Sequence, residues 1–170
     1  MALDIKSIQS IVNKDFVRGN KFSVIMSGAI AAGTDITDHL ISANFAGLSY
    51  GTVDYRNASP VLKLPNDIIY FPLRLSFHND AQGKVLTHFQ NLNRNKIIAD
   101  VKSDYSFNFF EEYTGDVELT QYNPQNQTAN KMKYVNAWVQ EVQDIQLSVE
   151  NSNVIQVVEV VLLYEYSEPV

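Results

Sequence analysis

Alternating apolar and polar residues recur along the chain and predict a series of β-strands. Successive side chains of a strand point to opposite faces, so a period of two marks a strand with one buried face. Leu73, Leu75 and Phe77 show the pattern clearly, with mostly polar residues between them. The same pattern predicts strands over 21–27, 70–78, 104–110, 132–142 and 144–150, with 117–119 continuing the alternation.

Residues 36–66 follow a weaker pattern. The stretch 36–56 predicts two strands joined near Gly47 and Gly51, and Pro60 and Pro65 predict an irregular segment after them.

One segment has a helical period instead. Val85, Leu86, Phe89 and Leu92 form an apolar stripe, and Asn79 or Asp80 is a suitable N-cap. We therefore predict a helix from about residue 81 to 94. The fold class that follows is mainly β: an antiparallel β-sandwich or barrel with one inserted α-helix, in a single domain over residues 1–170.

The end of the chain, from Val154 to Tyr166, reads as one long strand that is apolar on both faces. One core can cover only one of these faces. Leaving four apolar residues of the second face in water would cost about 6–12 kcal/mol. The predicted helix could cover part of that face, but at about 21 Å it is shorter than a strand of roughly 43 Å. We therefore expect another copy of the chain to cover the remainder. The residues predicted to form this subunit interface are Ile155, Val157, Val161 and Leu163.

Charge is distributed unevenly. The net charge is −6, and residues 136–170 contain six acids but neither Lys nor Arg. Strong binding to nucleic acid requires clustered Lys and Arg, so this composition predicts repulsion of DNA rather than ordinary binding. Cysteine is absent, which excludes disulfides and thiolate metal sites. No apolar run is long enough for a membrane helix, and we expect a soluble protein that is assembled in a cytoplasm.

Patterns that would indicate catalysis are weak. The glycines of the stretch 28–34 lack the Lys of a phosphate-binding loop, and His39, His78 and His88 have no metal-ligand spacing. Glu111 and Glu112 are adjacent, so on one strand they would point to opposite faces. We expect no enzyme activity, no cofactor and no metal.

Three segments carry a family resemblance. In 137–168, Trp138 precedes an alternating strand, an Asn-rich turn at 151–153 and a Val-rich strand that ends in Tyr, Glu and Tyr. Upstream, 15–26 ("DFVRGNKFSVIM") and 72–92 ("PLRLSFHNDAQGKVLTHFQNL") follow in the expected order. Together the three resemble the tail tube proteins of contractile-tailed bacteriophages. They cover well over half of the chain.

The resemblance implies a structural virion protein. Six subunits would form a ring whose inner strands make one continuous β-barrel, and stacked rings would form the hollow tube through which DNA is ejected. The implied partners are further copies, the tail sheath protein, the baseplate and the tape-measure protein. No cofactor is implied.

The resemblance also assigns candidate sites. The segment 45–66 would contact the next ring, with Phe45, Tyr50 and Tyr55 as candidate contacts. Acids on the wall of the bore would prevent adhesion of phosphates. The candidate lumen acids are Glu111, Glu118, Asp144, Glu150, Glu159 and Glu165.

Two departures from the family pattern leave alternatives open. Val139 follows Trp138 where the family often has Pro, and Ser148–Val149 replaces a more acidic and aromatic step. A tube-initiating ring of the baseplate and a tube subunit of a bacterial secretion system are therefore alternatives. A monomeric ligand-binding β-barrel is the third.

Overall fold

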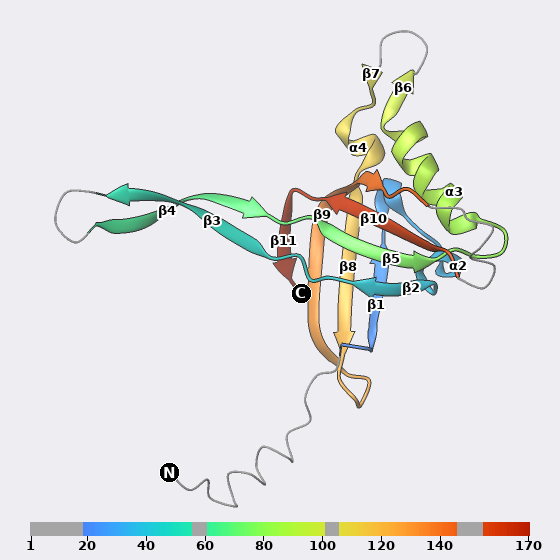
Figure 1. Ribbon diagram of the computed structural model, residues 1–170, viewed down its shortest axis with the longest axis horizontal. Helices are drawn as coiled ribbons and strands as arrows, with labels where there is room; N and C mark the ends of the chain where they lie inside the picture. Colours follow the sequence, from blue (N-terminus) through green and yellow to red (C-terminus); the bar gives the residue numbers. More distant parts are fainter. Residues whose placement is uncertain (1–18, 56–60, 101–105, 146–154) are drawn as a thin grey trace, which may run out of the picture.

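The computed structural model describes residues 19–55, 61–100, 106–145 and 155–170. Its body is a sandwich of two antiparallel sheets that share one long strand, β9 (Thr128–Val142) (Figure 1). Sheet A contains β1 (Phe22–Met26), β8 (Gly115–Tyr122), β9 and β11 (Tyr166–Pro169). Sheet B contains β2 (Leu40–Ala43), β5 (Leu73–His78), β10 (Val157–Leu163) and the end of β9. The predicted mainly β, antiparallel fold is confirmed.

A bulge in β9 lets one strand serve both sheets. Asn136 has a φ of 54°, a left-handed conformation that Asn tolerates better than most residues. Gly115 pairs with Ala137 but Val117 pairs with Tyr134, so β9 carries one extra residue at this point. A bulge bends its strand. Residues before the bend therefore pair within sheet A, and residues 138–142 pair with β10 of sheet B.

The inner faces of the two sheets pack into one core. The alternation seen in the sequence places these side chains inward, as predicted for 21–27, 70–78 and 132–142. The buried residues of sheet A include Val24, Met26, Val117, Leu119 and Tyr134, and those of sheet B include Leu73, Leu75, Phe77, Val158, Val160 and Leu162. The interior that a ligand-binding barrel would leave open is thus filled by side chains.

The predicted helix is confirmed but begins later. Helix α3 (Lys84–Asn91) continues as a π-helical turn, η2 (Leu92–Lys96). The Lys84 N–H donates to Asp80 Oδ1 at 2.5 Å. Asp80, one of the two expected caps, therefore accepts a hydrogen bond from the first residue of the helix, although it lies four residues before it. The ring of Phe89 lies 5.1 Å from that of Phe77, which places α3 against the inner face of sheet B. Three single-turn helices were not predicted: η1 (Gly28–Ile30), α2 (Thr34–Thr37) and α4 (Phe110–Tyr113).

The prediction of one unbroken strand from Val154 to Tyr166 is wrong. The segment forms β10 and β11, separated at Tyr164 and Glu165, because it must follow β9 around the bulge; the Glu165 N–H donates to the Val135 carbonyl at 3.0 Å. Residue 154 lies outside the described residues.

The second face of β10 is partly covered within the chain. Val161 is buried and Leu163 is half-buried, whereas Ile155 and Val157 are 63% and 40% exposed. Val161 pairs with Arg74 and Glu141, whose aliphatic stems flank it.

Two further predictions failed. The strand expected at 104–110 shrinks to β7 (Ser106–Phe107), which pairs with β6 (Ile98–Asp100), and Phe109 is exposed. The segment around Pro65, expected to be irregular, forms β4 (Leu62–Tyr70). The predicted strand 144–150 and its turn fall largely on residues 146–154, which lie outside the described part.

No helix among the described residues is long and apolar enough to cross a membrane.

Candidate functional site

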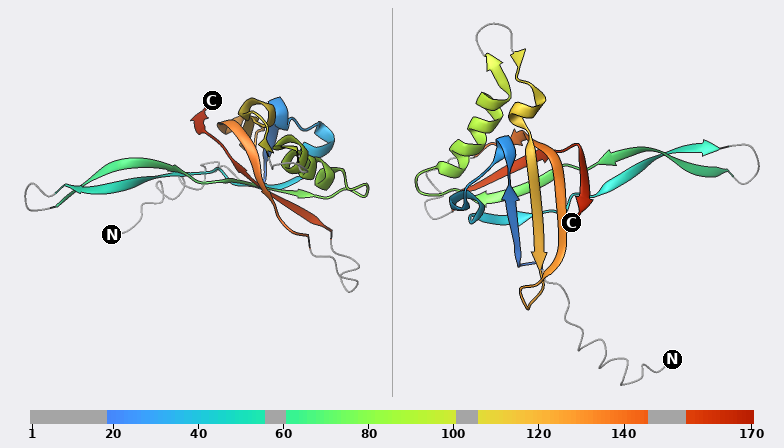
Figure 2. Two further views of the ribbon diagram at one scale, coloured as in Figure 1. Left: turned by 90° about the horizontal axis from the view of Figure 1, so that it is seen from above. Right: turned by 180° about the vertical axis from the view of Figure 1, so that it is seen from behind.

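A long hairpin projects from the body and is the most distinctive surface of the molecule. It consists of β3 (Leu48–Tyr55) and β4 (Leu62–Tyr70), which form a separate two-stranded sheet, the arm (Figures 1 and 2). Isolated hairpins are marginally stable in water and normally hide their apolar side chains. The exposed apolar residues of this arm are Leu48, Tyr50, Val53, Tyr55, Leu62, Leu64, Ile68 and Ile69.

The exposed apolar area of the arm is large for a free surface. If each of these side chains leaves about half of ~150–180 Å² in water, the total is roughly 600–700 Å². This is close to the share of ~800 Å² that one partner contributes to a standard protein interface. The arm is therefore built to contact another molecule.

The apolar side chains of the arm lie on both faces of the ribbon. Tyr50 pairs with Ile68 on one local face, and Val53 pairs with Leu64 on the opposite face, with a register shift between Tyr50 and Thr52. Two-stranded ribbons twist strongly. The two strands cross midway along the arm in each view of Figures 1 and 2, as expected of a twisted ribbon. Apolar side chains are therefore available on both faces of the arm.

Buried aromatic side chains anchor both strands of the arm. Tyr134 is fully buried, and its hydroxyl accepts a hydrogen bond of 3.0 Å from the Ala46 N–H, just before β3. Burial raises the pKa of Tyr134 to about 12. The Tyr164 ring lies 4.8 Å from that of Tyr134 and 5.6 Å from that of Tyr70, at the end of β4. The root of the arm is thus tied to the core.

Backbone contacts complete this root. The Arg74 N–H donates to Asn44 Oδ1 at 2.5 Å, and the Asn44 N–H donates to the Arg74 carbonyl at 3.3 Å. The Phe71 N–H donates to the Gly47 carbonyl at 3.0 Å. These bonds continue the pairing of β2 and β5 into the arm, so sheet B sets the direction in which the arm leaves the body.

Replacing Tyr134 by Phe is expected to loosen the root. The buried Ala46 N–H would lose its acceptor, which typically costs about 1–3 kcal/mol. Chemical denaturation should show that loss in the free energy of unfolding, and amide hydrogen exchange at Ala46 should accelerate. Tyr122→Phe is the matched control, because its hydroxyl bonds the part-buried Ser23 hydroxyl, which water can reach. Equal effects of the two changes would contradict this role of Tyr134.

The five candidate lumen acids in the described part of the chain lie in different elements. The structure places Glu111 in α4, Glu118 on the outer face of sheet A, Asp144 just after β9, Glu159 on the outer face of sheet B and Glu165 between β10 and β11. Glu150 lies outside the described residues.

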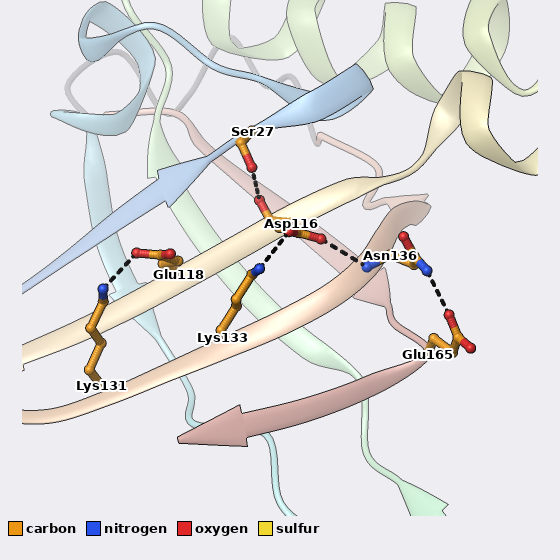
Figure 3. A network of polar contacts seen from close by, with 7 residues as sticks. All are labelled: Ser27, Asp116, Glu118, Lys131, Lys133, Asn136 and Glu165. Atoms are coloured by element: carbon orange, nitrogen blue, oxygen red, sulfur yellow. Dashed lines mark hydrogen bonds and ion pairs between the residues drawn. The ribbon is translucent and has the colours of Figure 1, made fainter. Parts of the chain in front are cut away.

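The acids on sheet A are paired with lysines. Lys131 Nζ lies 2.8 Å from Glu118 Oε2, and Lys133 Nζ lies 2.9 Å from Asp116 Oδ2 (Figure 3). The hydrogen bond from Lys133 is the main cause that lowers the pKa of Asp116. Such surface pairs contribute little to stability. Their consequence is electrostatic, because they neutralise the acids of this face.

Asn136 holds two acids at the bend of β9. Its backbone N–H donates to Asp116 Oδ1 at 3.2 Å, and its side-chain amide donates to Glu165 Oε2 at 2.6 Å (Figure 3). Glu165 therefore has a structural partner at the point where β10 gives way to β11.

The predicted ring-contact residues lie on or beside the arm. Phe45, Tyr50 and Tyr55 are all exposed, Phe45 at the root and the two tyrosines in β3. Sequence reasoning missed the apolar residues of β4, although they alternate on both sides of Pro65. It also missed the exposure of Phe107 and Phe109, which it placed on one face of a longer strand.

The described residues include no group of three or more His, Asp or Glu side chains that could hold a metal ion. Glu111 and Glu112 lie in the first turn of α4 and are exposed. Open surface hollows flank α3, one of them lined by His88 and Glu112 and the other by Arg94 and Asp144. The geometry of the site is thus that of a contact surface.

Solved structures with a similar fold include chains of tube assemblies. A chain in the cryo-EM structure of an extracellular contractile injection system, the PVC sheath–tube complex in its extended state, has a TM-score of 0.64 at 16% identity, over 95% of this chain and 97% of that chain. A chain of the anti-feeding prophage cap, which terminates the tube, has a TM-score of 0.65 at 14% identity, over 92% of both chains. The Hcp1 protein of E. coli EAEC 042 pathovar has a TM-score of 0.52 at 13% identity, over 88% of this chain and 99% of that chain.

These likenesses, all below 25% identity, establish a shared fold. No curated protein sequence matches the chain. A family model described as phage tail tube protein matches residues 29–168, which is most of the chain. On that match, this protein belongs to the phage tail tube protein family.

Proposed function

We propose that this structural tube subunit assembles into six-membered rings, and that the arm joins each ring to the next. The arm is the observation that carries the proposal. A soluble monomer has no use for an exposed apolar surface of this size on a hairpin that projects from its core. Ring-to-ring contacts by Phe45, Tyr50 and Tyr55 are part of the same proposal.

The partners follow from the kind of tube. One solved relative is part of a sheath–tube complex and another is part of a baseplate assembly. We propose the same two partners for this chain, together with a tape-measure protein inside the growing tube. In a phage tail the tube is assembled in the host cytoplasm and the cargo is DNA. The alternatives are an injection-system tube with protein cargo and a tube-initiating ring.

Electron microscopy of the purified chain in negative stain tests the proposal. We expect rings with six-fold symmetry, or tubes built of such rings, at micromolar concentration and above. A protein that stays monomeric by light scattering across concentrations and salts would contradict it.

We propose that the outer face of sheet B lines the bore. Glu159 and Glu141 project from this face and, among the described residues, neither forms an ion pair. The acids of the sheet A face, Asp116 and Glu118, are matched by lysines instead. A conduit for a polyanion requires uncompensated negative charge, because phosphate adhesion would slow transit. The sheet B face, where Arg74 is the cation beside Val161, has two acids without an ion pair, whereas both acids of the sheet A face are paired.

Glu159→Lys is expected to slow DNA release from assembled particles. Every ring would gain two positive charges per copy on the bore, and several phosphate contacts would form at once. We expect roughly a tenfold or greater loss of infectivity at low ionic strength, eased by added salt. Glu118→Lys is the matched control, since it lies on sheet A. Normal release by the Glu159 variant would exclude sheet B as the bore wall.

A further inference from the structure

A second exposed apolar surface lies on β7 and α4, away from the arm. Phe107, Phe109 and Phe110 are 72%, 82% and 45% exposed, and we call these three residues the aromatic knob. The knob stands beyond one end of the sandwich next to α3, whereas the arm leaves from another side of the body (Figures 1 and 2). Its exposure is unusual, because phenylalanine is among the residues most often buried.

The knob is held in place by contacts to the body. The Phe110 ring lies 5.6 Å from the Tyr113 ring, which lies 6.2 Å from the Trp138 ring of β9, and both contacts are edge-to-face. The Thr114 hydroxyl donates to the Phe110 carbonyl at 2.9 Å. This side of the knob is therefore anchored to the sheet. A surface ordered in advance loses little conformational entropy when it binds.

The other two rings flank a fixed residue. The Asn108 N–H donates to the Ile97 carbonyl at 3.0 Å, and its side-chain amide donates to the Lys96 carbonyl at 2.7 Å. Phe107 and Phe109 stand on either side of Asn108, so both rings are presented to solvent from a tethered backbone. Their exposure is thus built into the fold.

The knob and the tip of the arm match in size. Three largely exposed phenylalanines present roughly 400 Å² of apolar surface. The tip of the arm, with Val53, Tyr55, Leu62 and Leu64, presents about 300–350 Å². Joined, they bury less than the ~1,200 Å² of a stable stand-alone interface. Such a contact is weak between two copies and becomes strong when a ring repeats it.

We propose that the tip of the arm of one copy docks on the aromatic knob of a neighbouring copy. Both surfaces belong to every chain and face different directions, so one copy cannot satisfy its own arm. The contact is therefore head-to-tail, and each copy takes part in it twice. It pairs aliphatic side chains of the arm with aromatic rings of the knob. The inference rests on the proposed tube function and names the surface that receives the arm.

Introduced cysteines test this contact directly, because the chain has none of its own. A variant with both Leu64→Cys and Phe109→Cys is assembled and oxidised with copper–phenanthroline in air. If the arm meets the knob, the non-reducing gel will show a ladder of covalent oligomers beyond the dimer. Each single variant can form dimers at most. When the two single variants are mixed in equal amounts, random pairing would make half of all dimers mixed. We expect the mixed dimers to exceed that half.

The matched control joins Leu64→Cys with Ile25→Cys. Ile25 is 58% exposed on the outer face of sheet A, where it pairs with Glu118, and it is not part of the knob, so this pair should give no ladder. A ladder in the control, or none in the Leu64 and Phe109 variant under conditions where electron microscopy shows assembled particles, overturns the arm–knob contact and leaves the tube function standing. Failure of the unsubstituted chain to assemble overturns the tube function itself.

Discussion

Tube formation is expected to disappear when Val53 and Leu64 are both replaced by aspartate. The two side chains are cross-strand neighbours near the tip of the arm, and both are exposed in the single chain. Each replacement would remove about 1.5–3 kcal/mol of stabilisation that apolar burial gives to the contact, and burying the new charge would add a further cost. Together this weakens each contact by roughly 10²- to 10⁴-fold. Sedimentation and electron microscopy should find rings or monomers but no tubes.

The fold should survive this double change. Substitutions at exposed positions usually alter the free energy of unfolding by less than ~0.5 kcal/mol. Thr52→Asp is the matched control, because Thr52 is exposed on the opposite local face of the same part of β3. Long tubes formed by the double variant would show that the apolar side chains of the arm tip have no role in assembly. Equal loss in the Thr52 control would show that the arm is contacted on both faces.

Gly115→Ala is expected to be the most destabilising small substitution in the body. A Cβ at this position would overlap the Ser27 carbonyl oxygen and would come within 2.8 Å of Ile30 Cγ1. The backbone cannot easily give way, because the Ser27 N–H donates to Asp116 O at 2.9 Å and the Ala29 N–H donates to Thr114 O at 3.1 Å. Overpacking of this kind costs about 2–4 kcal/mol. Thermal and urea unfolding should both register the loss.

Gly33→Ala is the control for this prediction. Its added Cβ would approach only the carboxylate end of Asp35, a side chain that can rotate away. We expect little change in its unfolding midpoint. If both alanine variants unfold together, close packing at Gly115 is not the limiting feature of the junction between β1 and β8.

The sequence pattern predicted structure best where one strand or one helix is considered by itself. The alternation of Leu73, Leu75 and Phe77 identified a strand and its buried face, and the spacing of Val85 and Phe89 identified the helix. These patterns depend only on the periods of strand and helix, which are fixed by backbone geometry. The period therefore identifies the buried face of such an element without knowledge of the rest of the chain.

The closing segment shows where that reasoning stops. Its two apolar faces led to the prediction of a covering partner, but the sequence could not show that β9 bends at Asn136 and divides the segment into β10 and β11. The bend buries Val161 within the chain and leaves Ile155 and Val157 in solvent. A bulge arises from the pairing of distant strands, so no single stretch of residues contains the information.

The sequence by itself determined the mainly β class, the main strands, the helix and the resemblance to tube proteins, because each depends on short-range periodicity or on ordered motifs. The tertiary structure alone decided which apolar residues remain outside. It placed those of β3 and β4 on a projecting arm and the phenylalanines beside Asn108 on a knob, and it spread the acids over several surfaces. Exposure is a property of all neighbours in space, and most of those neighbours are far away in the chain.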